Sequence, residues 1–275
     1  MAFTVIGAVV SAGNIAARTP PLRIANVAVS RGSFNPRSGA SVALTVTLNR
    51  TALLDVEVVD RDGYVIRTFA PIRAAAGANN VTWDGKDAAG DVVADEAYSF
   101  RVIAKEGRES ADYFPAAHNA PLVSIDPLAY SRPTSTLTYE LPVASRVHIQ
   151  AGTMSNDASH PTDGAVLRTV VNREPRPAGK IAEHWNGFDE STSVYVPDLR
   201  GFGVAIAASP LPENSVIAYG NATRSFLEYA QHRNGQSLMR HQGPSMHHVG
   251  LDVFNDVAPK LVATPSGVYH AEERR

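Results

Sequence analysis

The two tryptophans of the chain each stand at the end of an alternating run and directly before a turn, as Trp83-Asp84-Gly85 and Trp185-Asn186-Gly187. An Asp-Gly or Asn-Gly pair supplies the side-chain acceptor and the positive φ that a tight turn needs. A tryptophan at the end of a strand can bury a large apolar area in the core of a sandwich. The two motifs therefore predict two all-β units, each anchored by one indole.

Period-two alternation of apolar and polar residues fills the segment from Ser33 to Gly107. Short alternating runs separated by turn residues are typical of an all-β sandwich. The alternating runs are 42–48, 54–59, 64–69 and 98–104, and the turn Asp60 to Gly63 separates the second from the third. The segment therefore predicts one antiparallel sandwich that contains the first tryptophan turn.

The same order of elements recurs later in the chain, which is the signature of an internal repeat. The matching runs are 137–141, 145–149, 166–171 and 202–208, with the second tryptophan turn between the last two. An inserted loop from Thr153 to Gly164 stands where the first copy has its tight turn. The predicted organisation is an N-terminal segment 1–22, a sandwich 23–107, a proline-containing linker 108–132, a sandwich 133–220 and a C-terminal extension 221–275.

Composition narrows the class of protein. A chain of 275 residues with a net charge of −2 shows no basic excess, so we expect no nucleic-acid partner. The absence of cysteine excludes disulfides, thiolate nucleophiles and Cys-ligated metals in this chain. No run is long and apolar enough to predict an integral membrane span. The apolar stretch Phe3 to Ala17 is interpreted either as a signal remnant or as a docking strand.

The first copy resembles the immunoglobulin-like domain of the bacterial flagellar hook-capping protein (the FlgD Ig-like type). The likeness rests on the Ala76-Gly77 loop, the run Trp83-Asp84-Gly85-Lys86-Asp87, Gly90 and the closing strand Tyr98 to Val102. It is weaker in the second copy, where Asn186 replaces the aspartate and the second glycine is missing. The helical region typical of a hook cap has no counterpart before Arg23, so we do not expect a hook cap itself.

The resemblance implies two tandem immunoglobulin- or fibronectin-like β-sandwiches with an irregular C-terminal extension. Modules of this type act as spacers, adhesion surfaces or assembly contacts outside the cytoplasm, and they are not known as catalytic units. The resemblance therefore implies a non-enzymatic structural or assembly protein of a bacterial periplasm, cell surface or secreted complex. Its partners are expected to be other proteins of a larger assembly, with an oligomer as one form of that assembly.

The exposed sandwich edges, the loop Thr153 to Gly164 and the C-terminal extension are the candidate contacts. We expect the extension to pack back on the second sandwich or to complete a partner's sheet by strand addition. No nucleophile elbow, phosphate-binding glycine loop or zinc-protease helix occurs, so the sequence gives no support for catalysis.

A carbohydrate-binding or enzyme-accessory module is the main alternative. It would need an exposed aromatic platform, on which sugar rings stack. Besides the tryptophans, the candidates for that platform are Tyr195, Phe202, Tyr219 and Tyr229. A tryptophan repeated before a turn is normally a packing residue, and we therefore favour the core over the platform.

Two groups of residues are candidate metal ligands. Oxygen-rich loops can bind calcium, although aspartate is also the expected residue of such turns; the acids concerned are Asp60, Asp62, Asp84, Asp87, Asp91 and Asp95. Imidazole and thioether groups can ligate copper, zinc or a haem iron; the candidates are His241, Met246, His247 and His248, with His232 and Met239 nearby. A solvated polar loop is the favoured interpretation of the second group, because adjacent histidines on a strand point to opposite faces.

Overall fold

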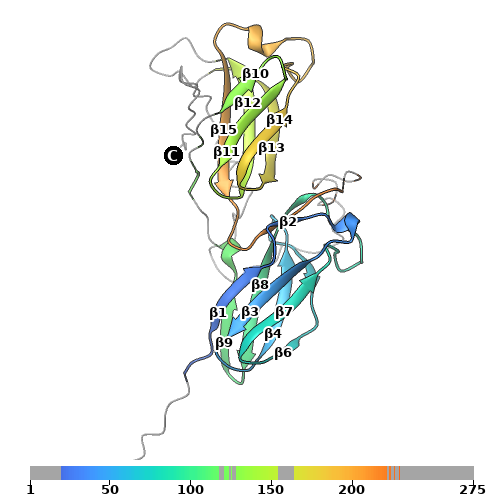
Figure 1. The fold of residues 1–275 in the computed structure, drawn as a ribbon, viewed down its shortest axis with the longest axis vertical. Coiled ribbons are helices and arrows are strands. Elements are labelled where there is room, and N and C mark those ends of the chain that lie inside the picture. The colour runs from blue at the N-terminus through green and yellow to red at the C-terminus, as the bar shows by residue number, and fades with distance from the viewer. Residues whose placement is uncertain are drawn as a thin grey trace, which may run out of the picture.

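The computed structural model describes residues 20–117, 121–123, 125, 128–153, 164–221, 223, 226 and 229. Within them the protein is all-β, with sheets arranged around two separate apolar cores, and the predicted fold class is confirmed. Figure 1 shows the two sandwiches one above the other. The stretch 3–17 and the metal candidates 232–248 lie outside the described residues, as does most of the predicted loop between Thr153 and Gly164.

The first sandwich packs a three-stranded sheet against a larger one. The smaller sheet has the order β1-β3-β7, with β1 Ile24–Val29, β3 Val42–Leu48 and β7 Gly77–Trp83. The larger sheet has the order β2-β16-β8-β4-β5, with β2 Ser33–Phe34, β16 Val216–Ala218, β8 Glu96–Glu106, β4 Ala52–Val59 and β5 Val65–Thr68. Two further strands extend it: β6 Ile72–Ala74 pairs with β4, and β9 Glu109–Tyr113 pairs with β8.

Alternation explains why these residues form strands. In β3, Val42, Leu44 and Val46 are fully buried, whereas the residues between them are half-buried. Two outward positions of β4 are acidic: Asp55 pairs with Lys105 at 2.6 Å, and Glu57 with Arg101 at 3.6 Å, both on β8. Opposite charges on neighbouring strands favour this register, because a slip of one residue would bring them into the core.

The second sandwich is built from two three-stranded antiparallel sheets. One has the order β10-β11-β14, with β10 Ala129–Ser131, β11 Thr136–Leu141 and β14 Gly179–His184. The other has the order β13-β12-β15, with β13 Val166–Arg176, β12 Ser145–Thr153 and β15 Phe202–Pro210. Short 3-10 helices occur at Pro36–Ser38, Pro115–Ala117 and Val196–Asp198.

The second sandwich is inserted into the first rather than following it. The chain leaves the first sandwich after β9, builds β10 to β15, and then returns as β16. Strand β16 lies between β2, to which it is parallel, and β8, to which it is antiparallel. Its three residues are all buried. A strand from beyond the second sandwich therefore completes the first.

Three predicted boundaries differ from this arrangement. The predicted sandwich 133–220 includes residues 216–218, but these pair with strands of the first sandwich, because a short apolar run carries no sign of the sheet that it joins. The predicted linker 108–132 contains β9 and β10. The described aromatic side chains of the C-terminal extension, Phe226 and Tyr229, belong to the core of the first sandwich and not to the second.

Asn221 fixes the returning chain to the end of the first sandwich. Its side-chain amide donates to the carbonyl oxygens of Val92 (3.1 Å) and Val93 (2.9 Å), and its Oδ1 accepts from Arg37 (2.8 Å). The carboxylate of Asp95 accepts the backbone N–H groups of Gly220 and Asn221 at 3.0 and 2.7 Å. These bonds satisfy the polar groups that follow the short strand, and they hold it in place.

We expect the Ile217→Pro variant to open the larger sheet of the first sandwich. Proline removes the N–H that donates to Gly32 O at 2.9 Å, at a position between two paired strands where proline is not tolerated. Hydrogen exchange should accelerate at residues 96–98 of β8 and stay slow in β12. The matched control Tyr219→Ala, just beyond the strand and 50% exposed, should leave both unchanged. Unaltered protection of β8 in Ile217→Pro would contradict the assignment.

Candidate functional site

The indole of Trp83 lies at the centre of the first core. It is 1% exposed, and its Nε1–H donates to the carbonyl oxygen of Lys86 at 2.9 Å. Phe34, Tyr98 and Phe100 surround it edge-on, with ring centroids 5.5, 5.3 and 6.1 Å away. A buried indole normally needs a partner for its N–H, and here the turn that follows the strand supplies it.

Trp185 repeats this arrangement in the second core. It is 3% exposed, and its Nε1–H donates to the carbonyl oxygen of Phe188 at 2.9 Å, again three residues further on. Tyr130 and Phe202 contact it, with centroids 5.0 and 6.2 Å away. Burial raises the pKa of the Tyr130 phenol to about 12.

The residue after each tryptophan makes the same hydrogen bond. Asp84 Oδ1 accepts the backbone N–H of Lys86 at 3.2 Å, and Asn186 Oδ1 accepts that of Phe188 at 3.1 Å. Either side chain offers an oxygen at this place. The replacement of aspartate by asparagine therefore keeps the turn, which the sequence motif predicts.

The glycine of each motif has both a positive φ and no room for a side chain. Gly85 has a φ of +74°, and a Cβ there would lie 2.4 Å from Pro36 Cγ. Gly187 has a φ of +83°, and a Cβ there would lie 2.3 Å from Tyr195 Cε2. Pro36 and Tyr195 thus lie so close to the two turns that only glycine, which has no Cβ, fits at these positions.

A second turn follows each motif and also keeps its geometry. The carboxylate of Asp87 accepts backbone N–H groups of the turn that contains Gly90, whose φ is +89°. Asp189 does the same in the second sandwich, where Thr192 adopts a φ of +59° in place of the missing glycine. Hydrogen bonds, the first from Ser191, lower the pKa of the Asp189 carboxyl.

Four of the six acidic candidates for calcium accept backbone N–H groups. Asp60 Oδ1 accepts the N–H groups of Asp62 and Tyr64 at 2.9 and 3.0 Å, and Asp84 and Asp87 accept N–H groups of their own turns. Asp95 instead accepts the N–H groups of Gly220 and Asn221 on the returning chain. Among the described residues no group of three or more acids or histidines gathers in a geometry that would hold a metal ion. The candidates His241, Met246, His247 and His248 lie outside the described residues.

The proposed aromatic platform is not assembled by the described aromatic residues. Of the four candidates, Tyr229 is buried, Tyr195 and Phe202 are half-buried, and Tyr219 is 50% exposed. Phe202 packs on Trp185, and Tyr195 packs on Phe188. The rings are thus used in packing rather than presented together.

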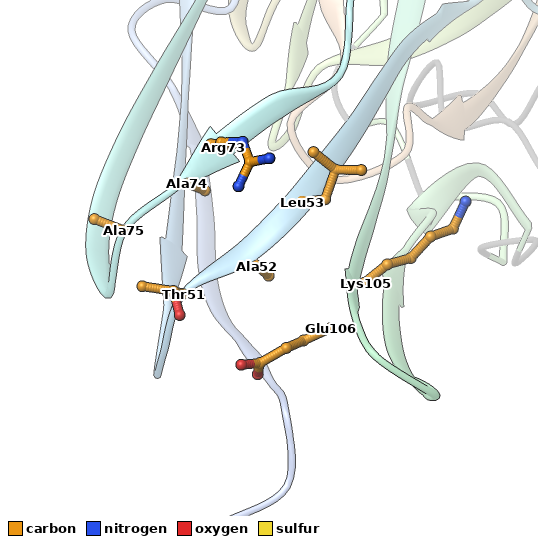
Figure 2. A pocket seen from close by; sticks show the side chains of 8 residues that line it. All are labelled: Thr51, Ala52, Leu53, Arg73, Ala74, Ala75, Lys105 and Glu106. Carbon is orange, nitrogen blue, oxygen red and sulfur yellow. The ribbon is translucent and has the colours of Figure 1, made fainter.

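An open hollow of about 620 Å³ lies on the first sandwich, where β4, β6 and β8 meet. Figure 2 shows Glu106 pointing toward Thr51, whereas Lys105 points away. Both charges are already paired, Lys105 with Asp55 at 2.6 Å and Glu106 with Arg50 at 2.8 Å. The hollow therefore does not present these groups jointly for acid–base chemistry.

The junction between the sandwiches holds polar side chains that the sequence analysis missed. Glu96 is 1% exposed, Arg146 is 6% exposed, and His148 is 7% exposed on the same face of β12 as Arg146. Burial, with a smaller contribution from the charge of Arg173, lowers the pKa of His148 from 6.5 to about 4. In the sequence these residues look like ordinary surface positions, because the pairing of Glu96 with Arg146 joins positions that lie far apart in the chain.

The fold and the turns define the chain as an immunoglobulin-like β-sandwich protein, with two sandwiches of that class. Residues 33–108 match the FlgD Ig-like domain family. The crystal structure of dimeric latent PorU from Porphyromonas gingivalis is a further match. It shares 11% identity and a TM-score of 0.20, over 76% of this chain and 21% of that chain. The present chain therefore spans about a fifth of the length of the PorU chain, and a likeness at this TM-score says nothing about function.

No curated protein matches the chain. Among the described residues, no helix has the length and apolar character needed to cross a bilayer.

We expect Gly85→Ala to destabilise the first sandwich more than Gly90→Ala. Both variants force alanine into a left-handed conformation, but only the first also drives a Cβ into Pro36, since nothing lies within 4 Å of a Cβ at Gly90. The difference isolates the cost of overpacking, about 1–3 kcal/mol, in urea unfolding followed by fluorescence. Equal losses in the two variants would show that the close packing of the turn contributes nothing.

Lowering the pH from about 6.5 to about 4 should reduce the free energy of unfolding through His148. The unfolded chain takes up a proton on this imidazole below 6.5, whereas the folded chain does so only near 4. Protons therefore favour the unfolded state in this window. Urea unfolding at several pH values should show a smaller loss for His148→Gln than for the parent chain. Parallel curves for the two proteins would contradict the assignment.

Proposed function

We propose that the chain is a non-enzymatic structural or assembly protein, which binds partner proteins in an extracytoplasmic bacterial complex. The match of residues 33–108 to the FlgD Ig-like domain family supports this proposal most directly. The burial of both tryptophans agrees with it, because the signature residues of each turn are used as scaffold.

We infer further that the two sandwiches are copies of one module. The support is the correspondence of the two turns, atom for atom: indole to carbonyl, side-chain oxygen to N–H, and glycine at a positive φ. A fourth correspondence joins the turns to a neighbouring strand, through Ala88 N to Ile66 O (2.8 Å) and Glu190 N to Leu167 O (3.0 Å). The two apolar cores support a division into two domains, with the second nested in the first.

The second sandwich is the better candidate for partner contact. It exposes the aliphatic side chains of Val143 (44%), Val166 (44%) and Val194 (38%). It is also the more divergent copy, with an enlarged hairpin loop between Thr153 and Gly164. Loops and edges on a rigid scaffold are where binding function concentrates.

The rival functions have less support. A carbohydrate platform built on the tryptophans conflicts with exposures of 1% and 3%. Acrylamide quenching of tryptophan fluorescence would separate the two: protected indoles fit the scaffold, and accessible ones would favour the carbohydrate reading. A metal- or haem-associated role for His241, Met246, His247 and His248 concerns residues outside those described.

Native complexes test the proposal. The full chain, tagged in its own cells, should fractionate outside the cytoplasm and elute with a defined protein partner at a mass above that of the monomer. Val194→Glu should dissociate this complex, whereas the matched variant Leu53→Glu, at a side chain 40% exposed on the first sandwich, should not. A cytoplasmic monomer, or a complex lost with Leu53→Glu and kept with Val194→Glu, would contradict the proposal.

A further inference from the structure

A carboxylate is buried where the two sandwiches meet. Glu96 is the first residue of β8 and is 1% exposed. Its ladder partner is Ala218 of β16, so it lies beside the strand on which the chain returns from the second sandwich. Burial of a charge is unfavourable unless the charge is paired and hydrogen-bonded.

Two arginines from different sandwiches pair with this carboxylate. Arg146 of β12, in the second sandwich, donates from Nη1 to Glu96 Oε1 at 2.6 Å. Arg61, in the turn between β4 and β5 of the first sandwich, donates from Nη1 to Glu96 Oε2 at 3.1 Å. The backbone N–H of Ala97 adds a third bond, to Oε1 at 2.7 Å. One anion therefore joins cations from both sandwiches.

Each arginine is itself held in place. Arg146 also donates to the carbonyl oxygen of Arg173 on β13 at 2.9 Å. The guanidinium of Arg61 lies over the ring of Phe226, 4.3 Å from its centroid. The charge of Arg61 in turn acts on Arg173, whose pKa is lowered first by burial and then by this neighbour. Three guanidinium groups thus converge on the junction, where Glu96 pairs with two of them and Asp62 lies 3.8 Å from Nε of Arg61.

The bond between Glu96 and Arg146 joins β8 of the first sandwich directly to β12 of the second. An exposed ion pair would add little at such a place. Here the side chains of Arg146 and Glu96 are 8% and 2% exposed, so that the pair is shielded from water and salt. In some proteins, buried polar or ionic groups of this kind specify a geometry rather than add stability.

We propose that the Arg61–Glu96–Arg146 triad is a latch that fixes the orientation of the second sandwich on the first. This role concerns the conformation of the chain. It goes beyond the proposed function, because it is inferred only from the ion pairs between the two sandwiches. With the carboxylate in place the two sandwiches present their outer ends at one fixed angle. Without it Arg61 and Arg146 lose the anion that they share, and the angle is released while each tryptophan core stays folded.

The absence of cysteine makes the angle directly measurable. Arg108→Cys and Lys180→Cys introduce spin labels at exposed positions, one on each sandwich of the full chain. Double electron–electron resonance should give one narrow distance distribution for the labelled parent chain. Glu96→Gln should replace it with a broad distribution. The matched control Glu57→Gln breaks an ion pair with Arg101 inside the first sandwich and should keep the narrow one.

A broad distribution in the labelled parent, or a narrow one in Glu96→Gln, would overturn the proposal. If Glu96→Gln fails to fold, Arg146→Met decides, because it removes the contact from the second sandwich and keeps the pair of Glu96 with Arg61. Tryptophan fluorescence of each variant checks that both cores remain intact, since each sandwich holds one tryptophan.

Discussion

The hydrogen bond from each buried indole to the carbonyl three residues further on is the interaction on which the structure depends. It lets a large aromatic side chain enter an apolar core without leaving its N–H unsatisfied. Because the acceptor belongs to the turn itself, the bond also fixes the direction in which the chain leaves the strand. The same tight turn brings a backbone N–H to the side-chain oxygen of Asp84 or Asn186, and it leaves no room for a Cβ at the glycine that follows.

The nesting of the second sandwich adds a constraint that a simple tandem array would lack. The chain that leaves the second sandwich must come back to the first, because β16 pairs with β8 in the larger sheet. Glu96 is buried at this point, and its two arginine partners come from the two sandwiches. For an assembly protein, such a junction would convert two small modules into a single rigid body with defined outer ends.

The sequence predicted the local features well, because they depend on neighbours along the chain. Alternation identified strands such as β3 and β12, and the Trp-Asp-Gly pattern predicted the turn at Trp83 down to its acceptor and glycine. It missed what depends on distant contacts. Val216 to Ala218 carry no sign of the sheet that they join, and Glu96 and Arg146 look like surface residues until the two sandwiches meet. The backbone conformation of Thr192 could not be predicted either, because its positive φ is one that is normally expected only of glycine.

Solvent exchange of the two indole N–H protons tests the central claim most directly. With only two tryptophans, a nitrogen-15 spectrum of the full chain contains two indole signals, one from each sandwich. We predict that both exchange slowly with water, because each donates to a turn carbonyl inside a dry core. Rapid exchange of either indole in the folded protein would show that this tryptophan faces solvent, and it would contradict the role of the turn as scaffold.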